Sequence, residues 1–223
     1  MKLHVGCGRR HIDGWVNADL YPTSATDMVF DLQEPWPIKE NDVEAIYGCH
    51  VFEHLTRPLD FLKEAWHALR PNGTVDLHFP YGGHRSAWWD HTHVRPYFAE
   101  WFAMLQPGYA EVTGNPQHLA WRYPFGVHDT HKRVGRHLAH ALADSWWRRR
   151  WLLPWLPYIQ DGIEELFVHL YALKTPDAVA EYQRTRPANA VPQQYVVWRH
   201  DWERRTLRPG EDIDLVPLPG ASP

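Results

Sequence analysis

The chain has 223 residues, which is enough for one domain with a full hydrophobic core. Its formal charge of -4, with histidines neutral, argues against a basic surface for nucleic acid. Two cysteines make no disulfide framework and the chain has neither an apparent signal peptide nor a long apolar run, so we expect a cytoplasmic location and no membrane span.

The first half of the chain predicts short strands around a glycine turn. We expect strands at Lys2–Val5, Val16–Leu20, Asp27–Leu32 and Val43–Gly48. The turn is Gly6-Cys7-Gly8, and the next strand ends near Asp19. Glycines let the backbone approach a ligand closely, and an acid at a strand end can accept hydrogen bonds from ribose hydroxyls. A plain tight turn between two strands explains the same residues, because the third glycine of the dinucleotide fingerprint is missing.

A helix and a further strand follow. Apolar residues recur with a helical period across Pro58–Leu69. The turn residues Pro71-Asn72-Gly73 end this helix, and Thr74–Pro80 is then a clear strand. The succession of helix, turn and strand predicts a parallel sheet.

The second half of the chain has weaker signals. We expect a loop at Tyr81–His93, a helix at Pro96–Leu105, a short strand at Tyr109–Thr113, irregular structure at Asn115–Asp129, a helix at Arg133–Trp147, and a strand or a helix at Glu165–Lys174. The last dozen residues are polar and proline-rich, so we expect a loose tail there. Several of the 13 tryptophans follow residue 145, which indicates an aromatic-rich cap or interface.

Taken in order, five motifs resemble the class I S-adenosylmethionine-dependent methyltransferases, and most of all the methyltransferase-11-like group. The motifs are Leu3–Gly8, Gly14–Asp19, Asp31-Leu32, His50–Leu55 and Leu69–Val75. The resemblance extends over Lys2–Pro80. It implies an α/β fold with a Rossmann-like, mostly parallel sheet, helices on both faces and an aromatic-rich C-terminal elaboration. Residues 1–175 would form the methyltransferase domain, with an acceptor-side insertion or cap at 115–160, and residues 176–223 a C-terminal extension and tail.

The resemblance implies S-adenosylmethionine as the cofactor, bound at the carboxyl ends of the first four strands. The N–H groups of the glycine turn would meet the methionine carboxylate. Asp19 would hold the ribose, Asp31 the adenine amino group, and His50 would line the sulfonium end. Asp31 is also explained as a helix-capping or turn residue. The implied cofactor-binding residues are Gly6, Cys7, Gly8, Asp19, Leu20, Asp31, Leu32 and His50.

Two features depart from the family pattern. Only a short segment joins Gly8 to Trp15, whereas a parallel crossover normally needs about a dozen residues or more. We therefore expect a stunted first crossover. Asn72 stands where a glycine is common, and asparagine tolerates the left-handed backbone that such a turn requires.

The loop after the fifth predicted strand offers acceptor-side residues. It contains Asp90 and His93, and the hypothesis is that His93 acts as general base while Asp90 orients it. A loop that merely caps the next helix is the alternative. Glu53 and His54 are interpreted as residues that order a helix start.

The sequence therefore predicts methyl transfer to a hydroxyl or amine of a small molecule, such as a sugar or metabolite. One alternative is a non-catalytic methyltransferase-like module that binds a partner through its tryptophan-rich region. Another is a metal-dependent hydrolase, whose ligands would be His91 and His93 with Asp90, Asp129 or His131. Because that spacing matches no strong metal motif, we expect no metal ion. The oligomeric state and the acceptor stay open.

Overall fold

The computed structural model describes residues 1–115, 117, 121–135, 138, 146–186, 191–196 and 215–216. The strands are β1 (Lys2–Val5), β2 (Val16–Asp19), β3 (Met28–Val29), β4 (Val43–Cys49), β5 (Leu69–Pro80), β6 (Phe125–Val134), β7 (Ile163–Ala172), β8 (Gln193–Val196) and β9 (Leu215–Val216). The α-helices are α1 (Pro58–Ala68), α2 (Ser86–Trp89), α3 (Tyr109–Thr113), α5 (Trp146–Leu152) and α6 (Pro176–Thr185). The 3-10 helices are η1 (Phe52–His54), η2 (Ala99–Leu105) and η4 (Leu153–Tyr158).

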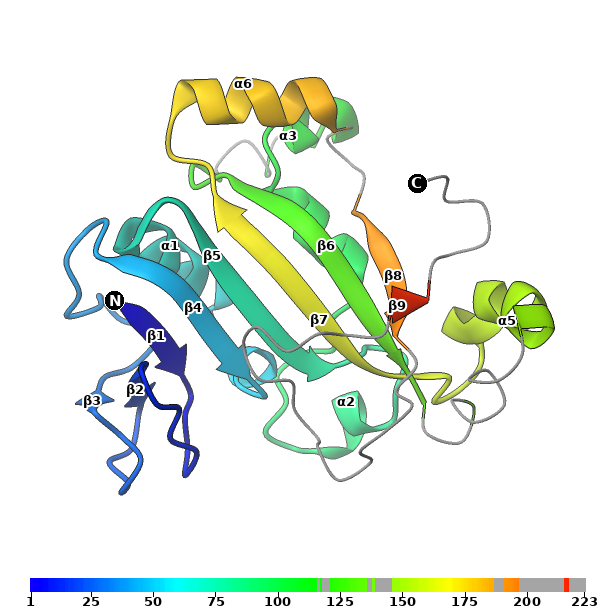
Figure 1. Ribbon diagram of the computed structural model, residues 1–223, viewed down its shortest axis with the longest axis horizontal. Coiled ribbons are helices and arrows are strands. Elements are labelled where there is room, and N and C mark those ends of the chain that lie inside the picture. Colours follow the sequence, from blue (N-terminus) through cyan, green and yellow to red (C-terminus); the bar gives the residue numbers. More distant parts are fainter. Residues whose placement is uncertain are drawn as a thin grey trace.

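These strands form one sheet in the order β3-β2-β1-β4-β5-β7-β6-β8-β9 (Figure 1). Neighbours from β3 to β5 run parallel, whereas β7 runs antiparallel to both β5 and β6. The order reverses between β1 and β4, and ligands of open α/β sheets bind outside the carboxyl ends of the strands at such a reversal. The predicted α/β class and the mostly parallel, Rossmann-like sheet are therefore confirmed.

The first crossover is stunted, as predicted, since no helix joins β1 to β2. The fully buried Asn17 organises this connection from within. Its side-chain oxygen accepts a hydrogen bond from the N–H of Ile12 at 2.9 Å, and its amide nitrogen donates to the carbonyl of Trp15 at 3.0 Å and to Asp27 at 2.9 Å. A single amide thus orders a segment too short for a helix.

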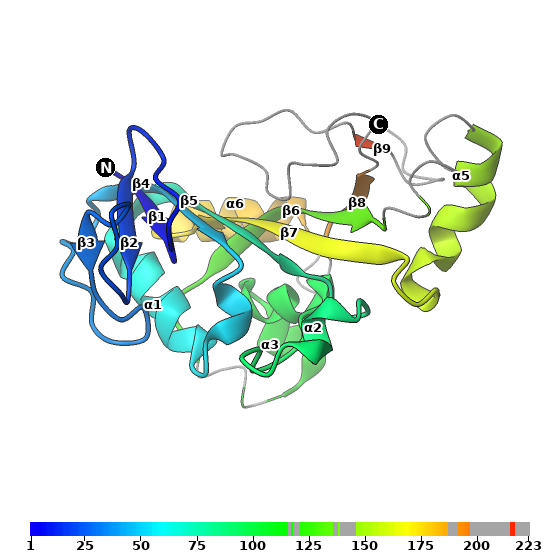
Figure 2. The ribbon, with the colours of Figure 1, turned by 90° about the horizontal axis from the view of Figure 1, so that it is seen from below.

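Helix α1 follows the predicted period and buries one face, with Phe61, Leu62 and Ala65 in the core. Its first residue is Pro58, where the missing N–H costs nothing. Asn72 takes the left-handed conformation expected of it, with φ of +61°. The residues around it belong to β5, whose pairing with β4 shifts register there. Helices α1, α2 and α3 lie on the same side of the sheet (Figure 2).

Two predicted elements in the second half are wrong. Tyr109–Thr113 is the helix α3, because Gly108 and Gly114, at φ of +85° and +64°, enclose a single helical segment. Phe125–Asp129 is part of β6 instead of irregular structure. Hydrogen bonds from β7 on one side and β8 on the other determine this strand, and its polar residues concealed the pattern.

The boundaries of other predicted elements also differ from those in the structure. The third predicted strand shortens to β3, and the Pro96–Leu105 helix becomes the 3-10 helix η2. Arg133 and Val134 end β6, so they do not begin the predicted helix Arg133–Trp147. Trp146 and Trp147 are helical in α5, whereas 136–137 and 139–145 lie outside the described residues.

The C-terminal part of the chain adds strands to this sheet. The alternation at Glu165–Lys174 is resolved as the strand β7. Leu215 and Val216, in the predicted tail, pair with β8 as β9, and all other residues of that tail lie outside the described part. Among the described residues no helix is both long and apolar enough to cross a membrane.

Candidate functional site

The glycine turn lies at the carboxyl end of β1, on the edge toward which β1, β4 and β5 all point (Figure 1). Gly6 and Gly8 adopt φ of +64° and +55°, a region that side chains disfavour. A Cβ on Gly6 would stand 2.6 Å from Val51, which follows β4. Only glycine fits at this position, and the close approach brings the ends of β1 and β4 together.

Asp19 closes the same turn from the end of β2. Its carboxylate accepts hydrogen bonds from the backbone N–H groups of Gly8 at 2.8 Å and Tyr21 at 3.0 Å. A carboxylate has about four acceptor positions, so further hydroxyl donors can still bind. The neighbouring Leu20 side chain is exposed beside it. This arrangement fits the two hydroxyl groups of a ribose at Asp19, with an apolar ring of the same ligand beside Leu20.

Among the other predicted cofactor residues, Leu32 and Cys7 are buried and Asp31 is partly exposed. Asp31 accepts a hydrogen bond from the N–H of Gln33 at 2.8 Å, which makes it a turn residue whatever else it binds. Leu32 packs in the core and its carbonyl accepts from the indole of Trp36. Cys7 is buried, and burial raises the pKa of its thiol. Leu32 and Cys7 therefore shape this edge mainly through packing.

His50 follows β4 in a left-handed conformation, with φ of +51°. Its Nδ1 lies 3.1 Å from Glu53 and its Nε2 lies 3.5 Å from Glu165. Although burial lowers the pKa of His50, hydrogen bonds to these two carboxylates raise it to about 9. The sulfonium side of the predicted site thus carries an imidazolium between two carboxylates.

A buried charge network extends from His50 across the sheet. Glu165 on β7 accepts from His78 of β5 at 2.5 Å and pairs with Arg133 of β6 at 2.8 Å. Burial alone would raise the pKa of Glu165, but its contacts with His78, His50 and Arg133 hold it well below its usual range. The ring of Phe167 stacks on His78 at 4.1 Å. Sequence reasoning missed Glu165, His78 and Arg133, and the only signal was charge within apolar strands.

His93, in the loop between α2 and η2, does not hydrogen-bond to Asp90. Its Nε2 is 3.9 Å from Asp90 and 4.0 Å from Glu53. Asp90 instead accepts from the N–H and hydroxyl of Thr92, at 2.8 and 2.6 Å. Thr92 thus engages one carboxylate oxygen of Asp90 while the other faces His93, and the orienting role of Asp90 stays a prediction. A general-base role for His93 stays a prediction.

The metal ligands of the hydrolase alternative are not brought together among the described residues. His91 is almost fully exposed, and Asp129 pairs on β6 with His128 and His131. Within the described part of the chain, two groups could hold an ion: Cys49 with His50 and His78, and Glu53 with His54 and His93. Neither group contains His91, Asp129 or His131, because those residues are spread between an exposed loop and β6.

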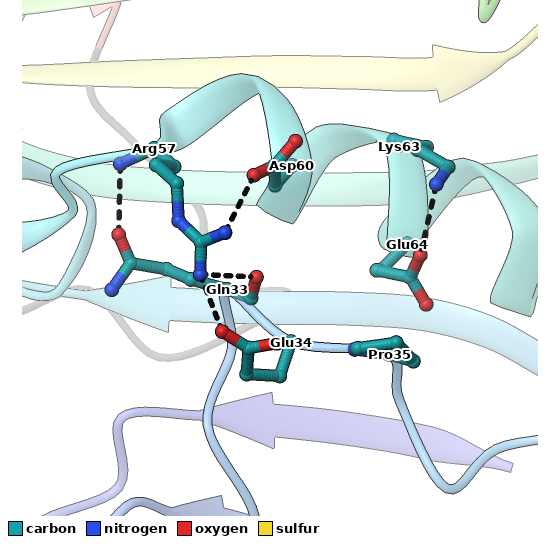
Figure 3. Close-up of a pocket in the computed structure, with 7 residues that line it drawn as sticks. All are labelled: Gln33, Glu34, Pro35, Arg57, Asp60, Lys63 and Glu64. Atoms are coloured by element: carbon teal, nitrogen blue, oxygen red, sulfur yellow. Dashed lines mark hydrogen bonds and ion pairs between the residues drawn. The ribbon is translucent and has the colours of Figure 1, made fainter.

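A pocket of about 190 Å³ lies beside the predicted adenine end (Figure 3). It is lined by Gln33, Glu34, Pro35, Arg57, Asp60, Lys63 and Glu64. Arg57 pairs with Glu34 at 2.6 Å and with Asp60 at 3.3 Å, and Lys63 lies 3.8 Å from Glu64. The charged side chains of this pocket pair with one another, as on an ordinary protein surface. The pocket is therefore a weak candidate for a ligand site.

Comparisons with known proteins give one family match and several distant structural likenesses. Residues 16–76 match the family model described as a methyltransferase domain. An S-adenosylmethionine-dependent methyltransferase from Archaeoglobus fulgidus is 14% identical, covering 76% of this chain and 84% of that one, with a TM-score of 0.46. A second S-adenosylmethionine-dependent methyltransferase, from Mesorhizobium loti, is 12% identical and covers 76% of this chain and 89% of that one, with a TM-score of 0.45. These likenesses are weak, and the fold assignment rests on this chain's own strand order. No curated protein matches the chain.

Proposed function

We propose that this chain, which carries a class I S-adenosylmethionine-dependent methyltransferase domain of the methyltransferase-11 type, methylates a hydroxyl or amine of a small molecule such as a sugar or metabolite. The hydrogen bond from Gly8 to Asp19 carries the proposal, because it joins the glycine turn and the strand-end acid at the sheet's reversal point. The free cysteines Cys7 and Cys49 suit a reducing cytoplasm as the place of action.

Each side chain at this edge receives a role in the proposal. The glycine turn takes the methionine carboxylate through its N–H groups, and Asp19 takes the ribose hydroxyls. Asp31 takes the adenine amino group, and His50 borders the sulfonium end. Asp90 and His93 belong to the acceptor side. The full cofactor set is Gly6, Cys7, Gly8, Asp19, Leu20, Asp31, Leu32 and His50.

Methyl transfer requires the protein to align the two reactants more than to take part in covalent catalysis. When bound, S-adenosylmethionine supplies a methyl group that is already activated. The acceptor's oxygen or nitrogen lone pair forms the new bond to the methyl carbon, while the carbon–sulfur bonding pair stays on sulfur. S-adenosylhomocysteine and the methylated acceptor result, and the acceptor's proton leaves to solvent or to an acceptor-side group. The protein's part is to hold both reactants in line.

Calorimetry with S-adenosylhomocysteine tests the proposal. Asp19→Ala should weaken binding by about 1.5–3 kcal/mol, since hydrogen bonds to a charged group are lost. Asp13→Ala removes a fully exposed acid of the same loop and serves as the matched control with unchanged affinity. Equal affinity in Asp19→Ala and wild type would refute the ribose assignment. Absence of binding in the wild-type protein would refute the function itself.

A further inference from the structure

We propose that Glu53, His54 and His93 form a binding site for one divalent ion of the zinc type on the acceptor side of the cofactor edge. One ligand atom from each side chain lies within 4.8 Å of the other two. Glu53 and His54 come from η1, and His93 comes from the loop between α2 and η2. The site itself is independent of the methyl-transfer proposal, and only its role in activating an acceptor rests on the proposed function.

Two buried atoms of this group lack any hydrogen-bond partner. Glu53 is only 3% exposed, and while its Oε1 faces His50, its Oε2 is unpaired. The side chain of His93 is 8% exposed, and its Nδ1 is likewise buried and unpaired. Unpaired buried polar atoms are costly and rare, and an unseen ion is one of the recognised explanations.

The hydrogen bonds of His54 leave its second nitrogen available as a ligand. The hydroxyl of Thr92 donates to Asp90 at 2.6 Å, so it can only accept from His54 Nδ1, which lies 3.0 Å away. The backbone carbonyl of Thr92 accepts from the same nitrogen at 3.2 Å. With the proton on Nδ1, the lone pair is on Nε2. Metal-binding histidines commonly donate their other N–H to a carbonyl or carboxylate in this way.

The surrounding packing holds the three side chains in place. The N–H of Val94 donates to the carbonyl of Glu53 at 2.8 Å, which ties the loop to η1. The rings of Phe52 and Tyr97, one from each segment, lie 4.8 Å apart in the core. Ligand atoms on a tetrahedral ion stand ~3.4 Å apart, given bond lengths near 2.1 Å. Small side-chain rotations would close the group around an ion, and the half-buried His54 gives solvent access.

The donor set indicates the kind of metal. Two imidazoles and one carboxylate suit zinc and similar divalent transition metals, whereas magnesium prefers oxygen ligands alone. Three protein ligands leave a fourth position open, where an acceptor oxygen could bind and lose its proton more easily. His93 would then be a ligand instead of the base suggested by the sequence.

The neighbouring group of Cys49, His50 and His78 is a weaker candidate. Both nitrogens of His78 are engaged, with Cys49 at 3.3 Å and Glu165 at 2.5 Å. Both nitrogens of His50 face carboxylates. Burial raises the pKa of the Cys49 thiol to about 12, which disfavours the thiolate that a metal requires. A metal there would have to break a network that is already satisfied.

The test is a Co²⁺ titration of tag-free, chelator-treated protein, followed by visible absorption, with Zn²⁺ competition and metal analysis of the purified protein. We expect one ion per chain. Glu53→Gln keeps the shape but loses the charge and should weaken Co²⁺ binding by more than about 100-fold, as should His93→Gln. His54→Gln provides a third, less buried variant. His91→Gln removes an exposed histidine of the same loop and should bind like wild type.

Several outcomes would overturn the site. These are no binding by wild type, equal affinity in Glu53→Gln and wild type, or a loss seen only in Cys49→Ser. Calorimetry with S-adenosylhomocysteine on the metal-free proteins separates this from the proposed function. Cofactor binding without metal binding rejects the metal site alone. Metal binding without cofactor binding rejects the methyl-transfer proposal and leaves the site intact. Retained cofactor binding also shows that each variant is folded.

Discussion

The two halves of this site are built from different kinds of contact. At the cofactor edge, Gly8 and Asp19 meet through backbone groups of neighbouring strands, and Asn17 orders the loop between them. On the proposed acceptor side, Glu165 joins His78 and Arg133, so three strands that are distant in sequence meet through buried polar and charged side chains. Geometry at the first edge depends on the local chain, whereas geometry at the second depends on the completed sheet.

This difference indicates how each half can fail. Because the glycine turn relies on backbone conformation, it should tolerate substitutions elsewhere in the fold but not a side chain at one of its glycines. A buried polar and charged network should respond to the loss of any member, because the remaining members lose a partner in a medium of low polarity.

The largest expected effect is on the acceptor side. Glu165→Ala should lower the free energy of unfolding by about 3–5 kcal/mol, because it removes the buried carboxylate that accepts from His78 and pairs with Arg133. Urea unfolding measures this. Glu181→Ala breaks an exposed pair with Arg184 and serves as control, with no measurable change expected. Equal effects in the two variants would show that the buried network contributes nothing special.

The next effect is at the cofactor edge, where two glycines form a matched pair. Gly6 and Gly14 both have positive φ, but a Cβ meets Val51 only at Gly6. Both alanine variants should lose about 1–2 kcal/mol of stability from the backbone, and Gly6→Ala about 1–3 kcal/mol more from crowding. A double-mutant cycle with Val51→Ala should recover part of that excess. Equal losses at Gly6 and Gly14 would mean that crowding at Gly6 is absent.

The smallest effect appears only in acid. Hydrogen bonds from the side chain and backbone of Arg85 hold the pKa of Asp161 at about 2, below its ordinary value of 3.8. The ionised carboxylate therefore stabilises the fold above that ordinary value, and this contribution is lost as the pH falls through 2. The stability difference between wild type and Asp161→Asn should shrink as the pH falls from about 4 to 2, below the range in which the neighbouring His84 titrates.

Unfolding at a series of pH values measures that difference, with Asp13→Asn as the exposed control. A difference that does not change between pH 4 and pH 2 would contradict the role of the Arg85 pair. Because Arg85 follows β5 and Asp161 precedes β7, the result also tests whether contacts on the acceptor side are more sensitive to acid than the backbone turn of the cofactor edge.

The same contrast explains what could be predicted from the sequence. The glycine turn, Asp19 and helix α1 were predicted, because turn residues and periodicity are local signals. Strand β6 was missed, because its polar residues hide the alternation and only pairing with β7 and β8 makes it a strand. The partners of Glu165 could not be predicted, since no spacing in the chain links β5, β6 and β7.

The position of β7 has a consequence for how the chain is made. It is inserted between β5 and β6, yet it is the last of the three to be synthesised. Until Ile163 to Ala172 leave the ribosome, β5 presents an open strand edge to any other chain nearby. A nascent or truncated chain that stops before Ile163 should therefore self-associate. Strand β7 thus also protects the newly synthesised chain from aggregation.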